Sequence, residues 1–239
     1  MYGAYERSAE VYDLVYSQML DYEANAARLC ELVEERVDGA ETLLEVACGT
    51  GAYLEPLSRS YLVTGVDLSP LMLEQARRRL PGAQLVEADM TSLDLGRTFD
   101  VVVCLFSSIA YVQTLEGLRS TIAGFARHLA PGGLVILEPW FPPEQWNDGY
   151  VGAISARNDE MAVGRVTTSR RHGHLVTMTF AFTVARPGGE VESFVEEHAT
   201  GQFTIEEHLE AFAAAGLVVD HDPDGLMGRG LYLASWPPG

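Results

Sequence analysis

The sequence predicts an α/β fold built on a parallel, doubly wound sheet, with an antiparallel sheet inserted late in the chain. Short apolar runs alternate with helix-like segments through the first part of the sequence. One of these runs, 133–138, is apolar on both faces, as expected for a strand buried between helices. From about Ala153 the pattern changes to alternating Thr, Val and Phe, and Pro187-Gly188-Gly189 marks a turn between two such stretches.

The elements of the first part follow from residue spacing. Residues 1–37 are expected to be helical, because Leu29, Leu32 and Val33 recur at helical spacing. Ser69-Pro70 suits the N-cap and first position of a helix. The alternation then predicts strands at 42–47, 61–66, 84–87, 99–105 and 133–138, and helices at 52–59, 70–79 and 115–129.

The later part of the chain is expected to hold inserted strands, followed by a helix and two further strands. Alternation predicts inserted strands at 163–168, 174–185 and 191–203. Thr204 and Glu207 form a capping box that begins a helix over 204–215, and strands are expected at 216–219 and 230–235. We therefore expect residues 1–152 and 204–239 to form one domain and 153–203 an inserted unit.

Composition narrows the class of protein. The 239 residues, 47% apolar, suit one domain with a sizeable insertion. No leader-like segment and no long apolar run is visible, so we expect a soluble, cytoplasmic protein without a membrane partner. Sixteen Lys and Arg face 34 Asp and Glu, and this balance argues against nucleic acid as a partner. Three separate cysteines (Cys30, Cys48 and Cys104) suit reduced thiols.

Polar and glycine residues cluster where the predicted strands end. Glu45 precedes Gly49-Thr50-Gly51 at a strand-to-helix turn, and glycine lets a ligand approach the backbone. Asp67, 18 residues after Gly49, ends the next strand, where a carboxylate accepts two ribose hydroxyls. Asp89-Met90 and Leu105-Phe106 follow the third and fourth strands. Because doubly wound sheets bind ligands at the carboxyl ends of their strands, these residues predict one nucleotide-type site.

Two other nucleotide sites fit less well. A nicotinamide dinucleotide site needs Gly-x-Gly-x-x-Gly, and Leu54 stands at the third glycine position. No Walker phosphate loop is present. The glycine turn with its preceding Glu45 resembles motif I of the class I S-adenosylmethionine-dependent methyltransferases, which implies a Rossmann-like fold.

Four blocks extend the resemblance to nearly the whole chain, from Tyr12 to Gly230. They are 46–51, Phe106-Ser107-Ser108-Ile109, Glu138-Pro139-Trp140 and Gly228-Arg229-Gly230-Leu231. Together they resemble the N,N-dimethyltransferases that act on dTDP-linked amino sugars and make the dimethylamino groups of desosamine and mycaminose in antibiotic biosynthesis. The resemblance implies S-adenosyl-L-methionine as cofactor, S-adenosyl-L-homocysteine as product, a nucleotide amino sugar as substrate, an added antiparallel sheet and a homodimer.

The resemblance also assigns roles to residues. Tyr5 and Tyr111 are expected beside the reacting amine. The expected cofactor-binding residues are Tyr12, Tyr16, Glu45, Ala47, Gly49, Gly51, Asp67, Leu68, Met72, Asp89, Met90, Leu105 and Phe106. The expected substrate-binding residues are Tyr22, Glu138, Trp140, Arg165, Arg170 and Arg229, with arginine suited to a diphosphate. Histidine spacing predicts no metal.

The expected reaction is in-line transfer of a methyl group to an amine. Because alignment of the reactants supplies most of the rate, no indispensable base is expected. Departures from the family at 140–144, 167–171 and Leu226-Met227 leave the sugar and the position of its amine open. Two other readings stay open here: a class I enzyme for another small amine or hydroxyl, and a cofactor-binding protein without turnover.

Overall fold

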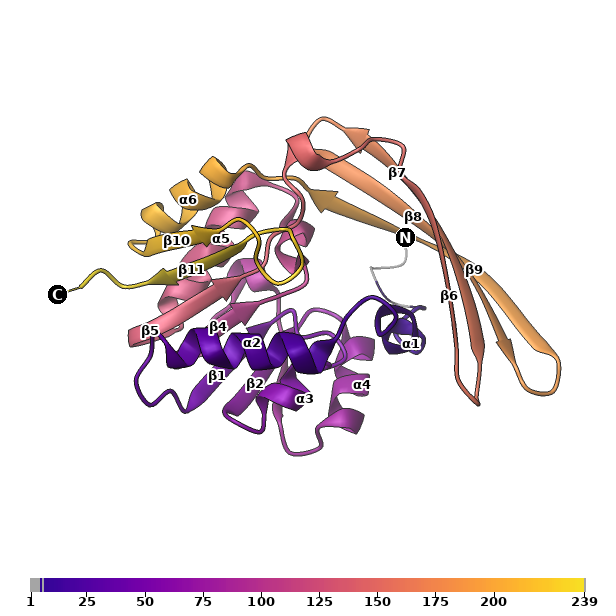
Figure 1. The fold of residues 1–239 in the computed structure, drawn as a ribbon, viewed down its shortest axis with the longest axis horizontal. Coiled ribbons are helices and arrows are strands. Elements are labelled where there is room, and N and C mark those ends of the chain that lie inside the picture. Colours follow the sequence, from indigo (N-terminus) through magenta and orange to yellow (C-terminus); the bar gives the residue numbers. More distant parts are fainter. Residues whose placement is uncertain (1–4, 6, 239) are drawn as a thin grey trace.

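The computed structural model describes Tyr5 and residues 7–238, and it contains two separate sheets (Figure 1). The larger sheet has seven strands in the order β10-β11-β5-β4-β1-β2-β3. Strands β1 to β5 run parallel, whereas β11 pairs antiparallel with both β5 and β10. The expected doubly wound sheet is confirmed, but it is mixed rather than wholly parallel. Its strands are β1 Thr42–Val46, β2 Leu62–Asp67, β3 Gln84–Glu87, β4 Phe99–Cys104, β5 Leu129–Leu137, β10 Val218–Asp222 and β11 Leu231–Ser235.

Helices cover both faces of this sheet (Figure 1). One apolar core joins Leu29 of α2, Leu54 of α3 and Leu73 of α4 to the strands. A second core, on the other face, includes Phe125 of α5 and Phe212 of α6. The helices are α1 Tyr12–Tyr16, α2 Tyr22–Glu34, α3 Leu54–Leu57, α4 Pro70–Arg79, α5 Leu115–Arg127 and α6 Ile205–Ala214, with short 3₁₀ turns η1 Met90–Ser92, η2 Ser108–Val112 and η3 Pro143–Gln145.

The N-terminal segment differs from the expected continuous helix over 1–37. Two helices, α1 and α2, are separated by 17–21, and residues 1–4 and 6 lie outside the described part. The break follows from Asp21, whose side chain accepts a hydrogen bond from the Ala24 amide at 2.9 Å and so caps the start of α2. The separation frees α1 to pack against the second sheet through Val15.

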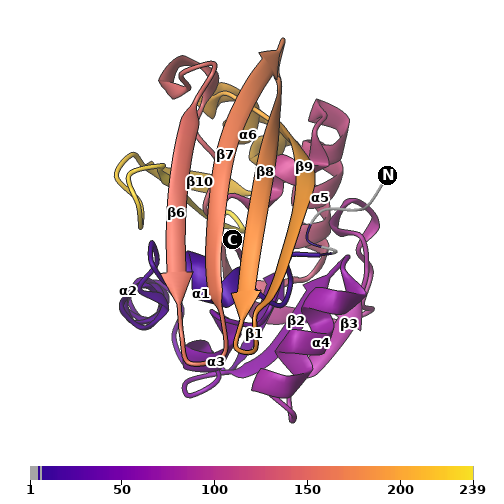
Figure 2. The same cartoon turned by 90° about the vertical axis from the view of Figure 1, so that its right-hand side faces the viewer.

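The second sheet is a four-stranded antiparallel meander in the order β6-β7-β8-β9 (Figure 2). Its strands are β6 Val151–Arg157, β7 Ala162–His172, β8 Leu175–Arg186 and β9 Glu190–Gly201. The inserted antiparallel sheet is thus confirmed, although β6 was missed because its small residues carry little alternation of apolar and polar side chains. The inner face packs on α1 through an apolar cluster that includes Phe180, Phe182 and Phe194.

The described helices include none that is both long and apolar enough to cross a lipid bilayer.

Candidate active site

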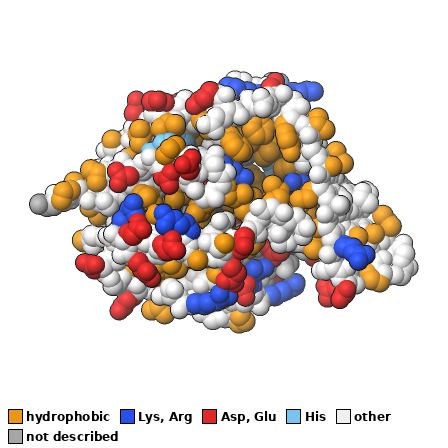
Figure 3. Space-filling view, viewed as in Figure 1, with side chains coloured by type: hydrophobic (Ala, Val, Ile, Leu, Met, Phe, Trp, Pro, Cys, Tyr) orange, Lys and Arg blue, Asp and Glu red, His pale blue; other side chains and the backbone are white. Residues whose placement is uncertain are grey.

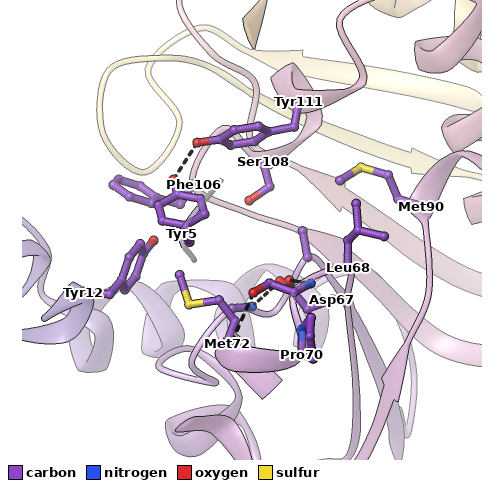
Figure 4. A pocket seen from close by; sticks show the side chains of 13 residues that line it. Tyr5, Tyr12, Asp67, Leu68, Pro70, Met72, Met90, Phe106, Ser108 and Tyr111 are labelled. Atoms are coloured by element: carbon purple, nitrogen blue, oxygen red, sulfur yellow. Dashed lines mark hydrogen bonds between the residues drawn. The ribbon is translucent and has the colours of Figure 1, made fainter. Parts of the chain in front are cut away.

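A cavity of about 380 Å³ opens where the carboxyl ends of the parallel strands face the four-stranded sheet (Figure 4). Its volume falls in the range of small-molecule sites. In the space-filling view, apolar side chains gather beside a hollow between the two sheets (Figure 3). The lining residues are Tyr5, Tyr12, Ala47, Gly49, Asp67, Leu68, Ser69, Pro70, Met72, Met90, Phe106, Ser108 and Tyr111.

The glycine turn presents open backbone to this cavity at one of its two glycines. A Cβ atom at Gly49 would meet nothing within 4 Å, so a ligand has room beside this residue. A Cβ atom at Gly51 would lie 3.3 Å from the Ala76 Cβ atom, so Gly51 instead allows the turn to pack on α4. Both glycines have positive φ, 55° and 74°, which other residues rarely adopt.

Asp67 fixes the turn from the end of β2. Its Oδ2 atom accepts a hydrogen bond of 2.8 Å from the Gly49 amide, and its Oδ1 atom accepts one of 2.8 Å from the Ser69 amide. Burial raises the pKa of Asp67, and these two amide bonds oppose the rise. The carboxylate keeps acceptor positions beyond the two amides, because each oxygen carries two lone pairs. Asp67 therefore both holds the turn and offers acceptors to a ligand.

Glu45 is a buried carboxylate without a full set of partners. It is 3% exposed, and its Oε2 atom has no hydrogen-bond partner in the structure. Burial, with a smaller contribution from Asp67, raises its pKa well above the ordinary range. It lines a small cavity beside the main one together with Tyr22, Leu105 and Gly49. An orphaned acceptor in that place fits the cationic amino group of S-adenosylmethionine.

An adjoining cavity of about 250 Å³ lies over the end of β3. Asp67, Leu68, Asp89 and Met90 line it. The Oδ1 atom of Asp89 accepts hydrogen bonds of 2.8 Å from both the amide and the hydroxyl of Thr91, which orients the carboxylate. The arrangement fits a flat polar ring held at the strand ends.

Aromatic side chains form the wall toward the second sheet. The ring centroids of Tyr5 and Tyr12 lie 5.3 Å apart, those of Tyr12 and Tyr16 4.4 Å, and those of Tyr16 and Phe106 5.3 Å. The Tyr111 hydroxyl donates a 2.7 Å hydrogen bond to the Tyr5 hydroxyl (Figure 4). Burial, the largest cause, raises the pKa of both Tyr5 and Tyr111, so both hydroxyls stay protonated at neutral pH.

A second orphaned carboxylate sits behind Phe106. The Phe106 amide donates a 2.7 Å hydrogen bond to Oε2 of the fully buried Glu138, whose Oε1 atom has no partner. Arg229 donates to the Ser107 hydroxyl at 3.0 Å and places its guanidinium 5.1 Å from the Phe106 ring centroid. Burial raises the pKa of Glu138, and the charge of Arg229 opposes this.

Strand alternation separates the two candidate arginines of β7. Arg165 points inward, is 9% exposed, and lies over the rings of Tyr16 and Phe180 at 5.1 and 4.9 Å. Its Nε and Nη1 atoms are buried without partners. Arg170 is exposed on the other face of the strand, so the structure does not bring it to the cavity.

Two other predicted residues lie beside the cavity rather than in it. Trp140 packs against Trp146 with centroids 4.6 Å apart and lines a separate cavity of about 50 Å³ that Arg229 also lines. Tyr22 packs edge-on against Tyr53 at 4.9 Å, and its hydroxyl is buried without a partner.

The structure adds two residues that the sequence analysis missed. His198 and Glu196 are buried on β9, and the His198 Nδ1 atom lies 2.7 Å from the Tyr111 hydroxyl. A signal for them exists in the sequence, because positions 196, 198, 200 and 202 carry polar residues at every second place of a predicted strand. Polar residues on a buried strand face need partners, which points to a site. No group of three or more His, Cys, Asp or Glu among the described residues is arranged to hold a metal ion.

Comparisons with known proteins agree with this geometry. Residues 43–133 match the family model described as a methyltransferase domain. The dTDP-3-amino-3,4,6-trideoxy-alpha-D-glucopyranose N,N-dimethyltransferase of Streptomyces venezuelae is 45% identical over 94% of this chain and 96% of its own length. The crystal structure of Streptomyces venezuelae DesVI superposes with a TM-score of 0.93 at 43% identity, covering 99% of this chain and all of that one. CalS10, an S-adenosylmethionine-bound amino pentose methyltransferase from Micromonospora echinaspora, gives a TM-score of 0.86 at 36% identity with coverages of 99% and 100%.

Proposed function

The chain belongs to the dTDP-aminosugar N,N-dimethyltransferases, S-adenosylmethionine-dependent enzymes of antibiotic sugar biosynthesis, and we propose that its own substrate is a dTDP-3-amino sugar that receives two methyl groups on its nitrogen. The 3-amino position follows the Streptomyces venezuelae relative, whose printed name places the amine there. One observation carries the proposal: the orphaned buried carboxylate oxygen of Glu45 lies on the cofactor side, and the orphaned guanidinium donors of Arg165 and Arg229 lie on the acceptor side.

We assign the cofactor to the turn at the end of β1. Glu45 receives the amino group of the cofactor, and Asp67 accepts hydrogen bonds from its ribose hydroxyls. Gly49 leaves room for the cofactor beside the backbone of the turn. Asp89 and Met90 hold the adenine in the adjoining cavity. The bound cofactor supplies an electrophilic methyl group. Gly51 and Tyr16 contribute indirectly in this assignment, through packing on α4 and on Phe106.

We assign the diphosphate of the substrate to Arg165 and Arg229. Their guanidinium groups lie over Tyr16 and Phe106, two rings whose centroids are 5.3 Å apart. Both arginines keep buried N–H groups without partners, and a guanidinium matches a phosphate in a bidentate manner. Glu138 and Trp140 lie next to Arg229 and are assigned to the sugar and nucleotide.

Positioning accounts for most of the rate in this proposal. The Tyr5 and Tyr111 hydroxyls orient the amine, and the aromatic wall excludes water. Holding two reactants in line is worth about 7–11 kcal/mol of barrier. The electron pair of a neutral amine needs no further activation, so the protein has to align the nitrogen and receive its proton.

We further propose that the enzyme is a cytoplasmic homodimer that associates through the outer face of the four-stranded sheet. Ala153, Val166, Ala181 and Val195 pair in register across all four strands, and Val166 and Val195 are 56% and 58% exposed. This row carries no charge in a chain of net charge −18. In this proposal the inserted residues 153–203 bind the substrate on one face of the sheet and the second subunit on the other. The three unpaired thiols suit a reducing compartment. Val166→Glu should give monomers in analytical ultracentrifugation, and an unchanged sedimentation coefficient would contradict this interface.

The function itself is tested by mass spectrometry of the purified protein with S-adenosylmethionine and a panel of sugars. We expect a dTDP-3-amino sugar to gain one and then two methyl groups, and its UDP counterpart to react more slowly. If the enzyme prefers the 4-amino isomer, the amine belongs at position 4 of the sugar and the assignment to position 3 is wrong. No methylation of any dTDP-amino sugar would refute the proposal.

A further inference from the structure

A line of hydrogen bonds leads from the cavity to a buried histidine. The Tyr5 and Tyr111 hydroxyls line the cavity and lie 2.7 Å apart, and the Tyr111 hydroxyl lies 2.7 Å from Nδ1 of His198. His198 is 1% exposed. Among the described residues, these two hydroxyls connect the buried imidazole to the cavity.

The far side of the imidazole faces a carboxylate. The His198 Nε2 atom lies 3.5 Å from Oε2 of Glu196. Glu196 accepts hydrogen bonds from the Ser8 hydroxyl at 2.6 Å and from the amides of Ser8 and Arg7 at 3.0 and 2.7 Å. Burial alone would raise the pKa of Glu196, but the nearby His198 ring and the hydrogen bonds from Ser8 and Arg7 outweigh burial and hold the pKa below its ordinary value. Glu196 is therefore ionised, and its negative charge lies beside the imidazole of His198.

The tyrosines themselves are poor bases. Burial raises the pKa of Tyr5 and of Tyr111, so neither holds a negative charge at neutral pH. A hydroxyl, however, accepts one proton while it donates another. The two tyrosines can therefore pass a proton without keeping it.

The other groups around His198 leave it a suitable acceptor. The rings of Tyr5 and Phe180 pack edge-on against the imidazole at 4.5 and 4.8 Å. Arg165 lies over the Phe180 ring at 4.9 Å, and its positive charge acts on the same region as the negative charge of Glu196. Among the described residues, the Glu196 carboxylate lies 3.5 Å from Nε2 of His198, whereas the Phe180 ring separates Arg165 from the imidazole.

We propose that His198, supported by Glu196, accepts the proton that the substrate amine loses, through the Tyr5 and Tyr111 hydroxyls. This inference rests on the proposed function. In this structure the Tyr111 hydroxyl donates to the Tyr5 hydroxyl, so the relay begins with rotation of both hydroxyls until Tyr5 donates to Tyr111 and Tyr111 donates to Nδ1 of His198. The ammonium nitrogen then gives its proton to the Tyr5 oxygen, the Tyr5 proton moves to the Tyr111 oxygen, and the Tyr111 proton moves to Nδ1 of His198. Both hydroxyls end as they began, the amine is neutral, and the imidazole is an imidazolium beside the Glu196 carboxylate.

Two methylations make such an acceptor useful. An amine that has received one methyl group from a sulfonium becomes an ammonium ion, which has no electron pair for a second transfer. It must lose a proton before it can react again. A buried acceptor connected to the cavity removes that proton without admitting water.

The test compares His198→Asn with wild type over pH 6.5 to 9, since Asn keeps a polar partner for Tyr111 but cannot take up the proton. We expect kcat to fall about 100-fold at pH 7, within the range of general base effects, and to recover as the pH rises and the amine loses its proton to solvent. The monomethylated product should accumulate near neutral pH. His172→Asn, at an exposed position on β7, is the matched control and should leave the pH profile unchanged.

Glu196→Gln supplies a second variant, should His198→Asn fail to fold. Because the imidazolium loses its carboxylate, the acidic limb of the kcat profile should move to lower pH while the plateau falls. Cofactor affinity, measured by calorimetry, should stay within threefold of wild type in both variants.

The outcomes separate the relay from the function. Wild-type turnover with a pH profile that both variants share would overturn the relay, as would a loss of rate that is the same at every pH, which marks a structural role. Absence of wild-type turnover on every dTDP-amino sugar would instead refute the proposed function, and the relay with it.

Discussion

The cofactor side and the acceptor side of the cavity are built in different ways. The cofactor side comes from strand ends of one continuous stretch, from Glu45 to Phe106, in which backbone atoms and single carboxylates are the groups assigned to the cofactor. The acceptor side is assembled from distant parts of the chain: 106 positions separate Tyr5 from Tyr111, and 87 separate Tyr111 from His198. The cofactor side therefore depends on local sequence, whereas the acceptor side depends on how the second sheet packs against the strand ends.

The largest expected effect lies on the cofactor side. Asp67→Ala should weaken S-adenosylmethionine binding about 100-fold or more, because two ribose hydrogen bonds are lost, each worth ~1–3 kcal/mol with a charged acceptor. Calorimetry measures this, with Asp94→Ala, an exposed carboxylate, as control. If the two sides are separate, dTDP affinity should not change. Unaltered cofactor affinity would remove Asp67 from the site.

The matching test of the acceptor side uses two arginines of one strand. Arg165→Ala should raise KM for the nucleotide sugar about 10- to 100-fold, because a charge-assisted contact to phosphate is worth about 1.5–3 kcal/mol. Arg170→Ala, at an exposed position of the same strand, should behave as wild type. Steady-state kinetics with cofactor in excess distinguishes them. Equal effects of the two changes would mean that the inward face does not bind the diphosphate.

Tyr111→Phe changes a residue at the point where the cofactor side and the acceptor side meet. It removes one hydroxyl between cavity and imidazole but keeps the ring, so kcat should fall by up to about 100-fold at pH 7, as in His198→Asn, with little change in cofactor affinity. Single-turnover kinetics gives the chemical step. A loss beyond ~10⁴-fold would show that alignment contributes less, and base catalysis more, than we propose.

The smallest effect concerns stability on the cofactor side. The pKa of Glu45 is raised in the folded protein, so its contribution to stability is full below the ordinary carboxyl range and is lost as the pH rises through the raised value. Glu45→Gln should therefore stabilise the ligand-free protein increasingly from pH 5 to 8, with about 2–4 °C in Tm for each kcal/mol.

The same substitution should weaken S-adenosylmethionine binding, because the amide cannot supply the negative charge that the Glu45 carboxylate offers to the amino group. Differential scanning calorimetry without cofactor should show the higher Tm of Glu45→Gln, and scanning with cofactor should show a smaller increase in Tm on binding than in wild type. A Tm that falls with Glu45→Gln at pH 8 would contradict the view of Glu45 as an acceptor held ready at a cost in stability.

Much of the cofactor side could be predicted from the sequence because its signals are local. The acidic residue, the glycine turn and the carboxylates at strand ends have fixed spacings, and β1 to β4 lie within one residue of the expected runs, whereas β5 begins at Leu129 instead of the expected residue 133. The two glycines could not be told apart in this way. Only the fold shows that Gly49 faces open space and Gly51 faces Ala76.

The acceptor side was less predictable because its signals are tertiary. Arg165 and Arg170 look alike in the sequence, and only the register of β7 sends one inward. The role of His198 follows only from the fold, which brings Tyr111 of η2 and Tyr5 of the N-terminal segment next to β9. The capping of α2 by Asp21 likewise overrode the helical spacing of 1–37, because a side chain to backbone bond fixes a helix start where apolar periodicity does not.

A crystal structure with S-adenosylhomocysteine and a dTDP-amino sugar bound tests the assignment of the two sides of the cavity directly. We expect the cofactor beside Gly49 with its ribose on Asp67, the diphosphate between Arg165 and Arg229, and the amine at the Tyr5 and Tyr111 hydroxyls. A nucleotide sugar bound on the outer face of the four-stranded sheet, near Arg170, or a cofactor away from the glycine turn would contradict the central claim.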